Sequence, residues 1–309
     1  MKKLILTLLI VFLSGILYVP QSPVAAISKA EAAGTNTIFD GNYASSTAYS
    51  SQRHVVRTTN GTNGNRTFAL IATTTGIGLA LFVTEDPDHA TPTWTYVGRI
   101  TTTSGDISGD MIWDETNNVL YITYGKDSAA DAATSDVFYR RVSSLNGASC
   151  NNTTSDCVIG AQQVAIAASA SVNYTRPHIA IAGDSGTQSV IIAANKHTNC
   201  SACAVAGLTV NAGTLNADAP SWGTLLLAKT WTANIFAGIF GLSRVNTDKL
   251  VIFYYDGADM LASLHDDAAD VNATSGWDAL DGTDNSQTTV SADDPKLPLG
   301  GAGSSVGLS

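Results

Sequence analysis

Four short runs of β-branched and aromatic residues recur along this chain, beginning at Phe68, Val119, Val190 and Leu250. The intervals between them are 51, 71 and 60 residues, and each interval contains about four short apolar runs separated by turn residues. The clearest copy is the segment 176–196, where two apolar runs flank a Gly-Asp-Ser-Gly turn and predict a β-hairpin. Four strands repeated every ~40–50 residues or more are typical of propeller blades, which bury their faces by packing on neighbouring blades. The repeat therefore predicts an all-β chain, a β-propeller of four-stranded antiparallel blades.

Two other all-β architectures fit this pattern less well. A β-sandwich would not require so long a repeat, and a β-helix would show a shorter one. We assign the repeats to residues 51–292, after a polar lead-in segment at 27–50. Four units are visible, whereas a closed ring commonly has more blades, so we expect an incomplete propeller. The tail 293–309 is then either a linker or the start of a further blade.

The N-terminus has the three parts of a secretory signal peptide. Lys2 and Lys3 supply the positive start, residues 4–19 form an apolar core, and residues 24–26 (Val-Ala-Ala) supply small side chains for cleavage. The apolar core is short for a membrane span, although an uncleaved anchor is the alternative interpretation. We therefore expect a signal peptide at 1–26 and a protein that is secreted or held at the cell surface. After cleavage, no other stretch reaches the ~18 apolar residues that a membrane-spanning helix needs.

The charge balance narrows the choice of partner. Acidic residues outnumber basic ones by 26 to 16, which gives a formal net charge of −10. Such a surface repels phosphate backbones, so we expect no nucleic-acid partner. The abundance of Thr, Ser and Asn is typical of exported β-proteins. The expected partner is an extracellular glycan or another surface component.

The four cysteines form two local pairs. In an exported chain, an even number of closely spaced cysteines indicates disulfides that fix loops. A redox motif at the second pair is the alternative, but the strand-then-helix context that would tune a thiolate is missing. A zinc site is a further alternative, with poor spacing in the first pair. The expected disulfide cysteines are Cys150, Cys157, Cys200 and Cys203.

One feature of the repeats is the first hairpin of each unit, best seen from Arg176 to Ile181, and another is a tryptophan before the fourth strand. In these two features the chain resembles the sialidase-like propellers, the secreted BNR or Asp-box repeat group. The Asp box itself survives only in degenerate form, from Thr84-Glu85-Asp86 to Thr93-Trp94. The repeated tryptophans could stack on sugars. Their loop lies on the face opposite the expected site, so we expect them to pack between blades instead. These tryptophans are Trp94, Trp222 and Trp277.

The predicted topology places the candidate site at one face of the propeller. If strands run from the inside of each blade to its outside, the entries of first strands and the ends of second strands share a face. Polar groups around a central depression are the usual binding site, and ordinary solvated loop residues are the alternative. The candidate ligand-binding residues are Arg176, Tyr124, Lys126, Asp127, Asn195, His197, Tyr255 and Asp256.

The residues give little support for catalysis, and we expect a binding protein. A glycoside hydrolase or lyase acting in the depression is the alternative, and a structural spacer at the cell surface is another. The family resemblance implies three arginines on a substrate carboxylate, an Asp acid/base and a Tyr nucleophile activated by Glu. Arg176 precedes a proline as the family's first arginine does, but its spacing and blade differ. Other glycosidases need two carboxylates about 5–10 Å apart, a role that Asp127 and Asp256 could fill.

One acidic stretch raises the question of calcium. Six aspartates lie between residues 266 and 284, without the spacing of an EF-hand. We expect a solvated acidic loop there, with calcium as the alternative, and no other cofactor or metal.

Overall fold

The structure is a computed structural model of the full chain. It describes residues 52, 54–59, 65–72, 78–85, 92–103, 105–106, 108–126, 135–153, 155–183, 188–198, 205–230, 238–246, 249–255, 260–266 and 288–289. The chain divides into two units, Met1–Thr37 and Ile38–Ser309, and all described residues lie in the second. The predicted signal peptide, lead-in segment and tail lie outside the described residues. Within the described residues, no helix has the length and apolar character needed to cross a membrane.

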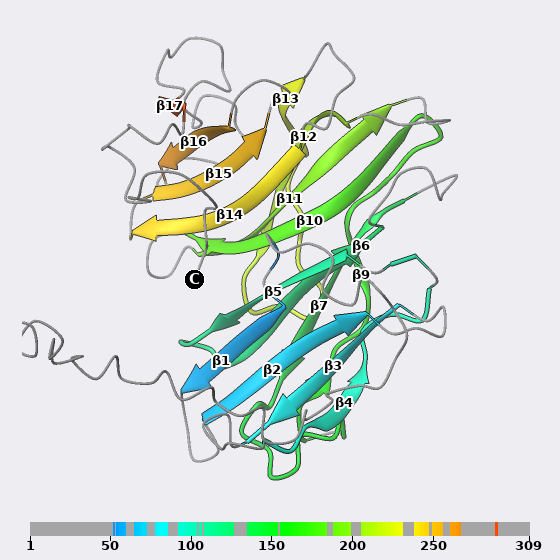
Figure 1. The fold of residues 1–309 in the computed structure, drawn as a ribbon, viewed down its shortest axis with the longest axis vertical. Helices are drawn as coiled ribbons and strands as arrows, with labels where there is room; N and C mark the ends of the chain where they lie inside the picture. Colours follow the sequence, from blue (N-terminus) through cyan, green and yellow to red (C-terminus); the bar gives the residue numbers. More distant parts are fainter. Residues whose placement is uncertain are drawn as a thin grey trace, which may run out of the picture. The chain divides into compact units, whose positions relative to one another are not determined.

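The described chain folds into four antiparallel sheets that follow one another in sequence (Figure 1). Sheet 1 consists of β1 (Val55–Thr59), β2 (Asn65–Ala72), β3 (Leu79–Thr84) and β4 (Thr95–Arg99). Sheet 2 consists of β5 (Ser108–Asp114), β6 (Val119–Gly125), β7 (Val137–Ser143) and β8 (Val158–Ile159), with β9 (Gln163–Ile166) also paired to β7. Sheet 3 consists of β10 (Val172–Ala182), β11 (Ser189–Thr198), β12 (Val205–Thr214) and β13 (Leu226–Thr230). Sheet 4 consists of β14 (Gly238–Asn246), β15 (Lys249–Tyr255), β16 (Met260–Asp266) and β17 (Thr288–Thr289).

In each sheet the first four strands pair in chain order, each with the next, and β9 is the exception because it pairs with β7. The four runs that define the sequence repeat all lie in second strands, in β2, β6, β11 and β15. The expected hairpin of segment 176–196 is β10 and β11, which pair from Val172↔Thr198 to Ala182↔Ser189. The first strand of sheet 1, β1, was not expected as a separate strand, because its sequence VVRTT has only two apolar residues.

The sheets pack face to face in chain order through three apolar seams. Successive side chains of a strand point to opposite faces of its sheet, so alternate residues pack on the preceding sheet and on the following sheet. Buried residues of β2 and β3 join those of β5 and β6 in the first seam, which includes Leu70, Leu81, Met111, Leu120 and Ile122. The second seam joins sheets 2 and 3 and includes Tyr121, Tyr139, Ile179 and Ile192. The third joins sheets 3 and 4 and includes Ile191, Leu208, Leu250 and Ile252.

This order of four-stranded meanders, each packed on the next, is the architecture of β-propeller blades, and the prediction of an all-β propeller is confirmed. Burying one large aliphatic side chain contributes about 1.5–3 kcal/mol, so each seam of this kind is a major source of stability. The described residues form four such sheets.

The tryptophans divide between two environments. Trp222 packs in the second seam, with its ring centroid 5.5 Å from that of Tyr139 in an edge-to-face contact. The inter-blade position expected for Trp222 is therefore confirmed. Trp94 instead packs on Ala69, Ala80 and Phe82 of its own sheet, on the face that alternates with the first seam. Trp277 lies outside the described residues.

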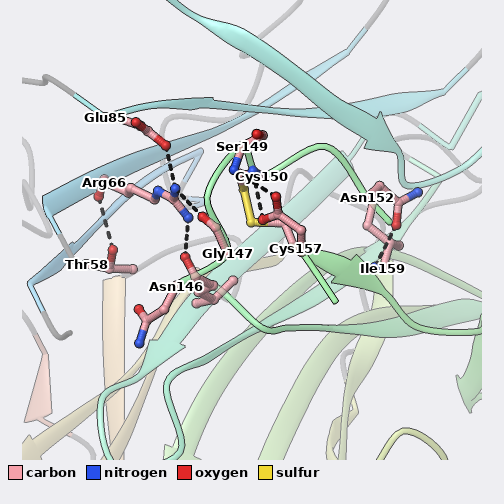
Figure 2. Close-up of a disulfide and its surroundings, with 12 residues drawn as sticks. Thr58, Arg66, Glu85, Asn146, Gly147, Ser149, Cys150, Asn152, Cys157 and Ile159 are labelled. Carbon is pink, nitrogen blue, oxygen red and sulfur yellow. Dashed lines mark hydrogen bonds and ion pairs between the residues drawn. A yellow bond between two sulfur atoms is a disulfide. The ribbon is translucent and has the colours of Figure 1, made fainter. Parts of the chain in front are cut away.

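A disulfide joins Cys150 and Cys157 in the segment between β7 and β8, as expected for the first cysteine pair. Both cysteines are fully buried and contribute to the first seam. Arg66 of β2 reaches this segment from sheet 1, and Figure 2 shows its guanidinium directed toward Gly147 and the disulfide loop. Cys200 and Cys203 lie outside the described residues.

Candidate functional site

The entries of the first strands carry polar side chains that bond across three sheets. Gln52, just before β1, donates from Nε2 to the Ser108 hydroxyl at 2.8 Å and to the Pro177 carbonyl oxygen at 2.7 Å. The Ser108 hydroxyl in turn donates to Gln52 Oε1 at 3.1 Å. Gln52 is only 4% exposed and Ser108 is fully buried, so these bonds are shielded from water. One amide side chain therefore ties the entries of sheets 1 and 2 to the middle of β10, the first strand of sheet 3.

A second link joins the first strands of sheets 2 and 3. Asp110 of β5 accepts a hydrogen bond from the backbone N–H of Ile179 in β10, at 2.9 Å. The same carboxylate oxygen lies 3.8 Å from Nδ1 of His178. Both side chains are 1% exposed. A buried carboxylate requires such partners, because water cannot solvate it there.

Lys126 and Asp106 form an ion pair at the end of β6. Lys126 Nζ lies 3.5 Å from Asp106 Oδ1, and the Thr101 hydroxyl donates to Asp106 Oδ2 at 3.4 Å. Burial raises the pKa of Asp106 above its usual value, although the charge of Lys126 acts in the opposite direction. Gly105 has a φ of +86°, and a Cβ there would lie 2.8 Å from Lys126 Nζ. Glycine at 105 therefore makes room for the lysine.

Arg176 occupies an unusual backbone conformation next to this ion pair. Its φ is +50°, in the left-handed region that non-glycine residues rarely adopt. It lies in an irregularity between Thr175 and His178 that shifts the β10–β11 register. Its backbone N–H donates to the carbonyl oxygen of Lys126 at 3.1 Å. Bulges of this kind redirect a side chain and are common near binding sites.

We call the group Gln52, Asp106, Ser108, Lys126 and Arg176 the inner-strand cluster. Two of its members, Lys126 and Arg176, were expected from the sequence, and the backbone bond between them brings these two residues together. Both are partly exposed, whereas Gln52, Asp106 and Ser108 are buried. Lys126 and Arg176 are thus the accessible members of the cluster, and the Lys126 ammonium is paired with Asp106.

Three other expected residues are buried: Tyr124 in the first seam, and Asn195 and His197 in β11 opposite the part of β10 that precedes Arg176. Tyr124 is fully buried in the first seam, with its ring centroid 5.4 Å from that of Phe138 and its hydroxyl accepting from Arg140 Nε at 3.3 Å. Burial raises the pKa of the Tyr124 hydroxyl. Asn195 and His197 of β11 are 1% and 5% exposed, and His197 Nε2 lies 2.8 Å from the Thr175 hydroxyl.

The remaining expected residues lie at the edge of what the structure describes. Asp127 and Asp256 lie outside the described residues. Tyr255 ends β15, and its side chain lies outside the described part.

Sequence reasoning missed Gln52, Asp106, Ser108 and Asp110. The sequence does contain a pattern that could have identified three of them. Asp106, Ser108 and Asp110 lie two residues apart, which is the spacing that places side chains on the same face of a β-strand. In the part of the chain that the structure describes, no group of three or more His, Cys, Asp and Glu side chains is arranged to hold a metal ion.

Comparisons with known proteins give no family. No protein-family model matches the sequence, and no curated protein matches it. Among solved structures, a xylan β-1,4-xylosidase from Bacillus halodurans C-125 is 10% identical, with a TM-score of 0.39 over 80% of this chain and 42% of the xylosidase. A Cellvibrio cellulosa α-L-arabinanase is 13% identical, with a TM-score of 0.42 over 77% of this chain and 75% of the arabinanase. This chain therefore spans less than half of the xylosidase, and likenesses this weak bear on neither ligand nor activity. The resemblance to BNR or Asp-box propellers stays a prediction.

Proposed function

We propose that this protein binds a glycan outside the cell, or at its surface, through the inner-strand cluster and without cleaving it. The observation that carries the proposal is the tie made by Gln52 across three sheets, which ends at Pro177, the residue after Arg176, whose N–H bonds to the Lys126 carbonyl oxygen. A binding site needs a few polar groups held in fixed positions, and a buried hydrogen-bonded layer supplies that rigidity. Export is supported by the N-terminal sequence and by the Cys150–Cys157 disulfide.

The engagement of the carboxylates favours binding over hydrolysis. Glycosidases of the common type use two carboxyl groups about 5–10 Å apart, one on each side of the scissile bond. Asp110 is nearly inaccessible and accepts the Ile179 N–H, so it serves the contact between β5 and β10. Asp106 is held by Lys126 and Thr101.

One observation favours a second candidate, a glycoside hydrolase in which Asp106 is the general acid. Its pKa is raised by burial, and a general acid needs a raised pKa to keep its proton near neutral pH. Candidates for the second carboxylate are Asp136, whose charge also raises the pKa of Asp106, and the expected residues Asp127 and Asp256, which lie outside the described residues. A spacer without any ligand is the third candidate.

A glycan array probed with the purified secreted chain separates these candidates. We expect binding to one glycan class, lost in Arg176→Ala and weakened at least tenfold in Lys126→Ala. Arg99→Ala is the matched control, since Arg99 is an exposed arginine of β4, the outermost strand of sheet 1. Equal binding by Arg176→Ala and Arg99→Ala contradicts the proposed site, and no binding by the wild type favours the spacer.

Incubating the bound glycan with the protein tests hydrolysis. Release of reducing ends that disappears in Asp106→Asn favours the hydrolase, whereas stable glycan supports the binding function.

A further inference from the structure

The cysteine loop, residues 144–157 between β7 and β8, supplies two hydrogen-bond acceptors to a buried arginine from another sheet. Arg66 of β2 is fully buried, and its guanidinium donates to the carbonyl oxygens of Leu145 and Gly147, the second at 2.5 Å. Its third partner is the carboxylate of Glu85. Figure 2 shows the guanidinium between Glu85 on one side and the loop on the other. Two of the three acceptors of Arg66 thus belong to a loop of sheet 2.

This loop adopts a backbone that its residues do not favour. Among its described positions, four non-glycine residues have a positive φ: Ser144 at 57°, Cys150 at 46°, Asn152 at 56° and Cys157 at 48°. Left-handed conformations are unfavourable for residues with a Cβ and persist only where the surroundings impose them. The loop therefore needs specific bonds to present its carbonyl groups to Arg66.

A disulfide and a set of hydrogen bonds hold the loop in this backbone conformation. The Cys150–Cys157 disulfide closes the loop over a separation of 7 residues. Inside that ring the Asp156 carboxylate accepts hydrogen bonds from the backbone N–H groups of Ser149 at 2.7 Å and Cys150 at 2.8 Å. The Cys157 N–H donates to the Ser144 carbonyl oxygen at 3.0 Å, which joins the two ends of the loop.

The position of the disulfide connects it to the first seam. Cys150 and Cys157 are fully buried and pack in the same apolar cluster as Leu145. If the loop opened, Arg66 would lose two acceptors while its charge stayed in an apolar seam. Arg66 would then keep only Glu85, and a buried guanidinium that loses two of its acceptors is strongly destabilising.

We infer that the Cys150–Cys157 disulfide is an oxidation-dependent lock on the seam between sheets 1 and 2, which acts by presenting the Leu145 and Gly147 carbonyl groups to Arg66. The thiols of Cys150 and Cys157 lose two electrons and two protons, and one S–S bond forms between them. A disulfide oxidant accepts the electrons and protons and is reduced to two thiols. Because both sulfurs are buried in the folded state, the lock closes during folding and is then shielded from thiol reductants. The first seam is thereby completed only under oxidising conditions.

The test is a double-mutant cycle in the full chain between the cysteine pair and Arg66. Cys150→Ala/Cys157→Ala removes the lock without adding a reductant that would also act on Cys200 and Cys203. We expect it to lower the urea midpoint of unfolding, and the same change in an Arg66→Met background to lower the midpoint by less than half as much. Methionine keeps most of the side-chain length and leaves no buried charge to satisfy. Equal shifts in both backgrounds show independent contributions and overturn the inference.

Glu85→Gln is the matched control, because Glu85 is the partner of Arg66 that lies outside the loop. We expect the full effect of the cysteine change to persist in this background. If Arg66→Met does not fold, amide hydrogen exchange on the Cys150→Ala/Cys157→Ala chain decides. Exchange in β2 should accelerate about tenfold or more while β15 is unchanged, and unchanged exchange in β2 overturns the inference.

Discussion

Replacing Gln52 with methionine tests whether one amide side chain holds three sheets together. Methionine is close to glutamine in length and volume, so the packing is retained while the hydrogen bonds are lost. The change leaves the Pro177 carbonyl oxygen and the Ser108 hydroxyl without their 2.7 Å and 2.8 Å partner in a buried setting. An orphaned buried acceptor costs about 1–3 kcal/mol, and the lost bond to the hydroxyl contributes about 1 kcal/mol more. We therefore expect Gln52→Met to lower the free energy of unfolding by about 2–4 kcal/mol.

Urea unfolding, followed by tryptophan fluorescence and far-ultraviolet circular dichroism together, measures this change. Gln162→Met is the matched control, because Gln162 is exposed and a surface substitution changes stability by only about 0.5 kcal/mol or less. Ser108→Ala should cost about 1 kcal/mol, since Gln52 keeps its bond to Pro177. The double variant should lose less than the sum of the single ones, because both changes remove the same bond. A loss below about 1 kcal/mol for Gln52→Met, or strict additivity, refutes the three-sheet tie.

Three further predictions concern other seams and the ion pair. Gly213→Ala places a Cβ 2.6 Å from the Trp222 ring, so we expect a loss of about 1–3 kcal/mol in thermal unfolding; an unchanged melting temperature contradicts the tight contact. Tyr121→Phe removes a hydroxyl that donates to Asp114 Oδ2 at 2.9 Å and accepts the Asn216 N–H at 3.0 Å. We expect this change to lower the free energy of unfolding in urea at neutral pH by about 1–3 kcal/mol, and an unchanged free energy argues against the link from Asp114 to Asn216. The pKa of Asp106 is raised on folding, so its contribution is most favourable below its unfolded pKa, near 3.8, and is lost as pH rises through the higher folded value. Asp106→Asn should remove that part of the pH dependence of the unfolding midpoint, and an identical profile in the variant shows that Asp106 is not its source.

The sequence predicted the strands well because their pattern is local. Runs such as Val119–Gly125 and Lys249–Tyr255 combine β-branched and aromatic residues with flanking turn signals, so they mark second strands directly. The strand Val55–Thr59 was not predicted because it contains only two apolar residues, both valines, and its other residues are an arginine and two threonines. Its position depends on pairing with β2 rather than on its own composition.

The candidate site was harder to predict because its contacts are distant in sequence. Gln52 and Pro177 are 125 residues apart, and no local pattern reports such a contact. Arg176 was expected at the site, but its left-handed conformation was not, because a residue before proline ordinarily prefers extended backbone. Tyr124 was expected at the site from its place at a strand end, whereas strand alternation turns its ring into the first seam.

The order of the seams has a consequence for how the protein comes apart. Sheets that pack only on their neighbours behave as a linear array. The stability of such an array is the sum of the stability of each sheet and of each contact between neighbouring sheets, so a terminal sheet can unfold by itself. Gln52 breaks that linearity, because it bonds sheet 1 to sheet 3 as well as to sheet 2. A second-neighbour bond makes the loss of any one of these three sheets costly to the other two. We therefore expect sheets 1 to 3 to unfold as one cooperative unit, and sheet 4, which packs on sheet 3 through the Leu250 and Ile252 seam, to open with less effect on the inner-strand cluster.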